Sequence, residues 1–504
     1  MMPPARSASR SAPLPILLLA GLTGCMVGPN YHRPSAPTTP AYKEAEGWTP
    51  AQPSDAADRK DWWTVFGDPT LNALEARVET SNQTLAAAEA AYRQAHALVA
   101  QDQAALWPVI TADASATASG GGANNTGVTT TPGGTTTGGT TTGGGTTTGG
   151  TTNGSSRGTQ TVYRVSLGAT WALDLWGAVR RNIRSAKASA QASAALVANA
   201  RLSAQTELAA DYVSLRELDE EKRDQDGTVT AFARTLTITQ NKYNAGNAQR
   251  SDVLTARSQL ESAQAGDTDL IQQRARMEHA IAILAGEPPA ALTLPPGAWT
   301  LTSPQIPASL PSVLLQRRPD IANAERTAAA QSEQIGVAVA AFYPSLNLTG
   351  DGGFSASNLA KLFNVSNSFW SVGADLAQTI FEGGARTAKV REARAAYEQA
   401  VANYRQTVLT AFGQVEDNLA AQRVYVTEED QLRRAYADAA VNVTITLNEY
   451  NAGTVDFTTV ATAQITALQA QRALVQVQAN RVTTAVSLIE ALGGGWTTAT
   501  LPKD

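Results

Sequence analysis

Residues 163–177 read YRVSLGATWALDLWG, and the pattern of a strand changes here to the pattern of a helix. From Tyr163 to Leu175 the larger apolar side chains occupy every second position, with polar or small residues between them. Successive side chains of a β-strand point to opposite faces, so this alternation predicts a strand with one apolar and one polar face. A long helical pattern starts directly after it, at Ala178.

Residues 110–117, 345–349 and 370–380 alternate in the same way, the last from Trp370 to Ile380, so the chain contains two predicted hairpins. Such strands are typical of membrane-spanning sheets. The alternative is a soluble sandwich, but no second sheet is available to cover the apolar faces. Membrane sheets of this kind close with about eight strands or more, and an open edge in lipid leaves backbone groups unpaired. We therefore expect an oligomer.

The chain is internally duplicated. Residues 104–108 (AALWP) recur as residues 340–344 (AAFYP), and residues 241–246 (NKYNAG) recur as residues 448–453 (NEYNAG). The first copy is longer because residues 119–158 are almost entirely Gly, Thr, Asn and Ser, a composition that cannot bury enough apolar surface to order itself. We expect an exposed, mobile loop there.

Long helices should join and flank the hairpins. Residues 178–243 and 385–450 contain no proline, and each would form a helix of about 100 Å. Shorter helices are expected to return over residues 251–284 and 458–492, and others to precede the hairpins over residues 72–106 and 320–342. In the second long helix a coiled-coil seam with 4-3 spacing is predicted, formed by Tyr397, Val401, Tyr404, Val408, Ala411 and Val415.

Composition and charge exclude several classes of protein. The net charge of -5 argues against a nucleic-acid partner, because binding phosphates requires a basic face. The single cysteine excludes disulfide frameworks and thiolate metal clusters. His32, His96 and His279 are scattered without the partners that catalysis requires. We expect no enzyme activity, no cofactor and no metal.

The N-terminus predicts an exported, lipid-anchored protein. Arg6 and Arg10 precede a short apolar run, residues 14–20, as in a secretory signal peptide. The following Leu22-Thr23-Gly24-Cys25 resembles a bacterial lipobox, which implies cleavage after residue 24 and lipidation of Cys25. Met26 in place of Asp favours the outer membrane. Beyond the anchor no run of 18 strongly apolar residues occurs, so any membrane crossing must use strands.

These features divide the chain into consecutive predicted segments: a signal peptide (1–24), a lipidated extended segment (25–70), a first repeat (71–290) that contains the Gly/Thr-rich loop 119–158, a linker (291–317), a second repeat (318–495) and a C-terminal tail (496–504).

Four segments, residues 25–34, 62–71, 174–177 and 315–321, resemble outer-membrane factor lipoproteins of the TolC and NodT type. The resemblance implies a mixed α/β membrane protein, internally duplicated, with a long α-helical barrel and four transmembrane β-strands per protomer. Three protomers would close one twelve-strand barrel in the bacterial outer membrane, anchored by lipid and extending into the periplasm.

The same resemblance implies a function. Such homotrimers are passive exit ducts of tripartite efflux pumps, and they dock on a periplasmic adaptor (membrane fusion) protein and an inner-membrane transporter of the RND type. The exported compounds and the identity of the pump are not encoded in the duct. A type I secretion channel and a coiled-coil spacer lipoprotein without a channel are the alternatives.

The helix turns after Tyr243 and Tyr450 correspond to the family's periplasmic aperture. Gly246 and Gly453 match its tip glycines, where an adaptor would dock; the alternative is a plain helix C-cap. Asp456 is the candidate for an acidic ring around the aperture, and a solvated helix cap is its alternative. Arg250 and Asp252, near the first tip, are candidate ties that hold the aperture shut.

Overall fold

The computed structural model describes residues 26–37, 39–44, 61–119, 160–304 and 317–502. Two compact units are assembled from distant parts of the chain. The sheet unit falls within residues 1–27, 103–179 and 340–384, and the helical unit within residues 28–102, 180–339 and 385–504. The signal peptide, Cys25 and residues 120–158 of the Gly/Thr-rich loop lie outside the described residues. The predicted division into repeats, linker and tail stays a prediction.

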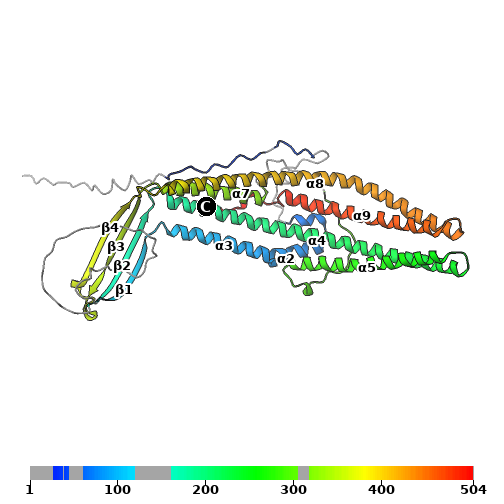
Figure 1. The fold of residues 1–504 in the computed structure, drawn as a ribbon, viewed down its shortest axis with the longest axis horizontal. Coiled ribbons are helices and arrows are strands. Elements are labelled where there is room, and N and C mark those ends of the chain that lie inside the picture. Colours follow the sequence, from blue (N-terminus) through cyan, green and yellow to red (C-terminus); the bar gives the residue numbers. More distant parts are fainter. Residues whose placement is uncertain (1–25, 38, 45–60, 120–159, 305–316, 503–504) are drawn as a thin grey trace, which may run out of the picture. The chain divides into compact units, whose positions relative to one another are not determined.

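The sheet unit is one antiparallel sheet in the order β1-β2-β3-β4 (Figure 1). Its strands are β1 (Val109–Ser119), β2 (Gln160–Leu173), β3 (Ser345–Ala356) and β4 (Ser368–Ala377). Both predicted hairpins are confirmed, and β2 pairs with β3 to join them. The predicted strand to Leu175 is two residues too long, because the chain turns at Asp174, whose carboxylate accepts the Val179 N–H at 3.1 Å. Ile380 likewise lies beyond β4.

The strand register places most of the large apolar side chains on one face. Leu167 lies opposite both Ala112 and Gly352, and Gly352 lies opposite Trp370, so these residues of all four strands share a face. The other face carries the polar side chains of the sheet, among them Asp113, Arg164, Asn347, Asp351 and Asp375.

The helical unit contains two pairs of long helices. Helix α4 (Ala178–Asn244) is followed by α5 (Arg250–Leu284), and α8 (Ala385–Ala452) by α9 (Phe457–Ala491). In each pair the two helices run side by side (Figure 1). The absence of proline predicted these spans to within two residues at the ends of α4 and α8.

Shorter helices complete this unit: α2 (Pro69–Ser81), α3 (Gln83–Ala104) and α7 (Pro319–Ala340). The prediction of one helix over residues 72–106 is wrong, because the chain breaks at Asn82. The Asn82 side chain accepts the Leu85 N–H at 2.9 Å and donates to the Leu284 carbonyl at 2.8 Å. It therefore caps α3 and fixes the junction to the end of α5.

The core of the helical unit is thin along α8 and broader around α2. On α8 the predicted seam is buried from Tyr404 to Val415, whereas Tyr397 and Val401 are half-buried. The broader part comes from the 3-10 helix η2 (Trp62–Phe66), whose aromatic rings pack in one cluster with α2, α4, α5 and α9. Aromatic side chains thus supply the volume that alanine-rich seams lack.

None of the helices in the described residues has both the length and the apolar character that a membrane span requires. The same residues contain no group of three or more His, Cys, Asp or Glu side chains that could hold a metal ion.

Candidate functional site: helix tips, central clasp and sheet faces

The two tips of the helical unit share one backbone geometry. Gly246 and Gly453 both adopt left-handed conformations, with φ of 76° and 79°. Beyond them the Asn247 N–H donates to Lys242 O at 2.8 Å, and the Thr454 N–H donates to Glu449 O at 3.0 Å. These bonds satisfy the last helical carbonyls, so each glycine ends its helix. Among the described residues other than the chain neighbours of each glycine, no atom would lie within 4 Å of a Cβ added at Gly246 or Gly453, so the space beside both turns is open there.

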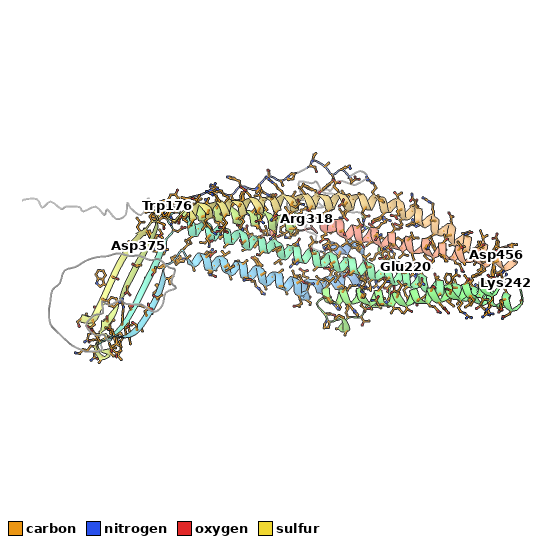
Figure 2. The ribbon with its side chains drawn as sticks, in the orientation of Figure 1. Trp176, Glu220, Lys242, Arg318, Asp375 and Asp456 are labelled. Atoms are coloured by element: carbon orange, nitrogen blue, oxygen red, sulfur yellow. The ribbon has the colours of Figure 1, made fainter. Side chains whose placement is uncertain are left out.

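Lys242 joins the two tips. Its Nζ donates to the carbonyls of Tyr450 and Asn451, the latter at 3.3 Å, and lies 4.1 Å from the centre of the Tyr450 ring. Figure 2 shows Lys242 and Asp456 at the turn end of the helical unit. A cation on the last carbonyls of a helix complements the helix dipole. The sequence contains a signal for this contact, since Lys242 and Glu449 occupy matching places in the two repeats and differ in charge.

A small apolar core lies under the tips. The rings of Tyr450 and Phe457 meet edge to face, 5.6 Å apart, and pack with Ala256 of α5. Burial raises the pKa of Tyr450, and the negative charge of Asp252 raises it further. Side chains of α5, α8 and α9 are therefore coupled at this end of the unit.

The predicted aperture residues have different surroundings. Asp252 accepts the Gln249 N–H at 3.2 Å, which caps α5. Asp456 stands at the N-cap position of α9, but its side chain accepts no capping hydrogen bond. Arg250 forms no ion pair among the described residues. The structure thus brings Asp252 near Tyr450 and leaves Arg250 unpaired there, and the gating roles stay predictions.

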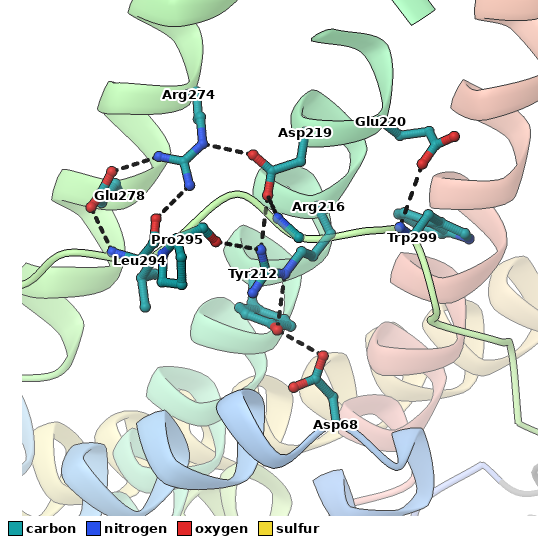
Figure 3. Close-up of polar contacts among 11 residues, drawn as sticks. Asp68, Tyr212, Arg216, Asp219, Glu220, Arg274, Glu278, Leu294, Pro295 and Trp299 are labelled. Atoms are coloured by element: carbon teal, nitrogen blue, oxygen red, sulfur yellow. Dashed lines mark hydrogen bonds and ion pairs between the residues drawn. The ribbon is translucent and has the colours of Figure 1, made fainter. Parts of the chain in front are cut away.

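A polar cluster, here called the central clasp, fixes the loop after α5 to the helices (Figure 3). Arg216 donates to Asp219 at 2.8 Å and to the Pro295 carbonyl at 3.0 Å. Arg274 donates to the other oxygen of Asp219 at 2.7 Å and to the Leu294 carbonyl at 2.6 Å. The cluster consists of Asp68, Tyr212, Arg216, Asp219, Arg274 and Glu278.

The clasp is structural in character. Its arginines are held by carboxylates and carbonyls, and Glu278 also accepts the Leu294 N–H at 2.8 Å. Nearby, a Cβ on Gly297 would lie 2.5 Å from Nη1 of Arg216, so the loop backbone passes directly over the guanidinium. Such a network orders the loop.

A second cluster fastens the segment that follows Cys25. We call residues 28–37 and 39–44 the N-terminal strap. Arg181 is fully buried and donates to the carbonyls of Gly28 (3.0 Å) and Pro29 (2.9 Å) and to the Glu333 carboxylate at 2.8 Å. A Cβ on Gly336 would lie 2.0 Å from Cδ of Arg181, so only glycine fits there.

The far end of the strap is bound to α8. The carboxylate of Glu416 accepts the N–H groups of Lys43 and Glu44, at 2.8 and 2.9 Å. Tyr42 is buried beside Phe412, with the ring centres 6.5 Å apart. The strap therefore connects α4 and α7 with α8, and sequence reasoning missed it because these partners are between 152 and 373 residues away.

The two faces of the sheet differ in chemistry. On the polar face Arg164 forms an ion pair with Asp351 and lies 4.3 Å from the centre of the Phe369 ring. On the apolar face, Trp370 and Val372 are 82% and 81% exposed. Soluble proteins rarely leave large apolar patches open to water. The apolar face therefore requires lipid or another apolar surface to cover it.

The outer membrane efflux protein family matches residues 76–287 and 310–494 of the chain. The fold, the helix tips and the sheet with one apolar and one polar face together define a class of proteins that form channels. The chain belongs to the outer membrane efflux protein family, and it is a component of outer-membrane efflux channels.

Two curated relatives are similar over nearly their whole length. The pyoverdine export outer membrane protein OpmQ of Pseudomonas aeruginosa is 31% identical over 456 residues, which cover 88% of this chain and 89% of OpmQ. The probable efflux pump outer membrane protein TtgC of Pseudomonas putida is 29% identical over 493 residues, covering 94% of this chain and 93% of TtgC.

Two solved structures share the fold. The outer-membrane channel OprN has a TM-score of 0.82 at 28% identity, covering 94% of this chain and all of OprN. The CmeC outer membrane channel of Campylobacter jejuni has a TM-score of 0.84 at 23% identity, covering 95% of this chain and 96% of CmeC. The expected fold class, with long helices and a sheet of four strands per protomer, is confirmed.

Proposed function

We propose that three copies of this chain form the exit duct of a tripartite efflux pump, through which small molecules pass without chemical change. The observation that carries this proposal is the sheet, which is apolar on one face, polar on the other and, within the part of the chain that the structure describes, unpaired at both edges. A duct through a lipid layer requires this combination, because lipid covers the apolar face and the polar face lines an aqueous path.

The open edges support a trimer. Within the described residues, β1 and β4 each pair with only one neighbour. In lipid, unpaired backbone groups cost several kcal/mol each, about as much as any buried polar group without a partner. Pairing β1 of one copy with β4 of the next removes both edges. Three copies would supply twelve strands, enough to close the sheet on itself.

The proposed partners follow from the family and from the tips. A periplasmic adaptor protein would dock at the open turns around Gly246 and Gly453, where the absence of a side chain permits close approach. The adaptor would connect the duct to an inner-membrane transporter of the RND type. The relatives named as efflux pump proteins support this assignment over the secretion and spacer alternatives.

The anchor is also part of the proposal. Lipid on Cys25 would hold the N-terminus at the outer-membrane surface, since each buried CH₂ adds about 0.8 kcal/mol to membrane attachment. In support, the next residues are fixed to the sheet unit: the Val27 N–H donates to the Trp176 carbonyl at 3.1 Å. The ring of Trp176 stacks on that of Tyr343, with centres 4.7 Å apart, and aromatic residues are favoured at membrane interfaces.

The tips would form the aperture, closed by the contact of Lys242 with α8 and narrowed by a ring of Asp456. Single-channel recording tests this. Lys242→Met removes the contact and should raise the open-channel current, and Asp456→Ala should raise the current and weaken block by trivalent cations. Arg257→Met, a change of an α5 cation that forms no ion pair among the described residues, is the matched control. Unchanged current in both variants would remove these residues from the aperture.

A further inference from the structure

The connection between β3 and β4, residues 357–367 and here called the β3–β4 loop, exposes several apolar side chains. Leu359, Phe363 and Val365 are 61%, 68% and 84% exposed. This hairpin end is opposite to the strand ends that continue into α7 and α8. Three exposed apolar residues within seven positions are unusual for a loop in water.

The loop is ordered by its own hydrogen bonds. The Asn358 side chain accepts the Ala360 N–H at 2.9 Å, and the Asn367 side chain donates to the Lys361 carbonyl at 2.7 Å. Leu362 is 3% exposed and anchors the loop from within. Two 3-10 turns, η4 (Leu359–Lys361) and η5 (Val365–Asn367), therefore hold the exposed side chains in place.

The exposed side chains continue the apolar face of the sheet. The ring of Phe363 meets the ring of Phe354 edge to face, with centres 5.6 Å apart. Phe354 lies opposite Val165, which belongs to the apolar face. The loop is therefore folded toward the face that the proposed function assigns to lipid, and away from the polar face with Arg164.

Lys361 gives the loop one positive charge. It is exposed and forms no ion pair among the described residues, and it is the only charged residue of the loop. A lysine beside apolar side chains can bury its methylene stem and keep the ammonium at a polar boundary. That boundary in a bilayer contains phosphate groups, which carry the complementary charge.

We propose that the β3–β4 loop dips into the outer leaflet of the membrane, with Phe363 and Val365 among the acyl chains and Lys361 on a lipid phosphate. This proposal rests on the proposed membrane orientation of the sheet, so its test includes reporters for that orientation. The bilayer itself contacts the loop, since the loop surface is continuous with the face that lipid covers.

Quenching by brominated lipid measures the depth of the loop. Val365→Cys, Val372→Cys and Ser371→Cys are labelled with an environment-sensitive fluorophore in the full chain. Each is reconstituted in vesicles of phosphatidylcholine with or without bromine on the acyl chains. Val372 reports the apolar face of β4 and Ser371 the polar face. The unsubstituted chain measures any labelling of Cys25.

The proposal predicts that brominated lipid quenches the label at residue 365 about as strongly as at residue 372, because both sit among acyl chains, and leaves residue 371 bright. A bright label at residue 365 with quenching at residue 372 would overturn the loop proposal alone. Equal signals at residues 371 and 372 would overturn the membrane orientation, and the loop proposal with it.

The role of Lys361 has its own measurement. Brominated phosphatidylglycerol should quench the label at residue 365 more than brominated phosphatidylcholine does, because its phosphate carries an uncompensated negative charge. Lys361→Gln should abolish this difference, whereas Lys389→Gln, on α8, should preserve it. A difference that survives Lys361→Gln would remove the lysine from lipid binding.

Discussion

Glu75 is the most unusual side chain of the helical unit. It lies on α2 with no exposed surface, and neither carboxylate oxygen has a partner among the described residues. Burial raises the pKa of Glu75 to about 9, so it is protonated at neutral pH. The carboxyl is therefore tolerated in the core only in its neutral form.

This burial predicts a pH dependence of stability. In the unfolded chain Glu75 ionises near its ordinary pKa of 4.5, whereas the folded chain holds the proton up to about 9. Between these values the unfolded state binds fewer protons, so a rise in pH costs the folded state up to about 1.4 kcal/mol per pH unit. In Glu75→Gln the free energy of unfolding should lack this part of its pH dependence, because glutamine does not ionise.

Chemical unfolding followed by circular dichroism between pH 5 and pH 9 checks the prediction about Glu75. The advantage of Glu75→Gln over the wild type should grow as the pH rises. Glu79→Gln, a change on the same helix at a half-exposed side chain, should leave the slope unchanged. Parallel slopes for Glu75→Gln and the wild type would show that Glu75 is already ionised in the fold.

Arg181 is the second residue with a predicted large effect. Arg181→Ala would leave the Glu333 carboxylate buried without its partner, and removing one member of a buried ion pair costs about 3–5 kcal/mol. Arg184→Ala, three residues along the same helix and exposed, should cost little. The midpoints of unfolding compare the two variants, and equal midpoints would contradict the role of Arg181.

Most single-residue contacts were not predictable from the sequence. Arg181 meets residues about 150 positions away on either side, and only the fold brings Gly28 and Gly336 to it. Asn82 looks like any polar residue within a helical pattern, yet its side chain caps α3 and binds the end of α5. The tip glycines were predictable, because a matching Asn-Ala-Gly ends both long helices.

At the scale of elements, the alternation of apolar and polar residues was sufficient to predict the strands, and the absence of proline was sufficient to predict the long helices. Tyr163, Val165 and Leu167 predicted the apolar face of β2, and the register confirmed it. The ends of the strands were not predictable, since Asp174 and Leu175 continue the alternation while the backbone turns away. The pairing of β2 with β3 also needed the structure, because it joins the two repeats.

The packing of α7 against the N-terminal strap gives a prediction at this scale. Gly336→Ala places a Cβ 2.0 Å from Cδ of Arg181, which donates to the carbonyls of Gly28 and Pro29, so the strap should detach. Limited proteolysis should then cut the strap in the variant before it cuts the wild type. Gly413→Ala, in α8 with open space around it, should leave the strap protected and stabilise the helix by up to about 1 kcal/mol.

Equal cleavage in Gly336→Ala and Gly413→Ala would contradict the tight approach of α7 and the strap. Comparing the two variants separates the effect of the tight approach from the effect of helix propensity, because both add one methyl group to a helical glycine. Only one of the two glycines has a neighbour in the way.

At the scale of the whole molecule, the duplication and the family resemblance predicted the class of protein, and the family match confirmed it. The central clasp was not predictable, because its arginines and acids lie on different helices and bind loop carbonyls that carry no sequence signature. Cys25 lies outside the described residues, so the lipid anchor stays a prediction from the lipobox alone.

Single-channel recording of the purified chain in a planar bilayer tests whether it forms a duct, with the native mass measured on the same sample. Wild type is recorded beside a Lys242→Met, Asp456→Ala double variant, because a closed aperture conducts poorly. We predict discrete current steps from a particle with the mass of three chains, larger in the variant. A monomeric particle that passes no current in either form would contradict the duct.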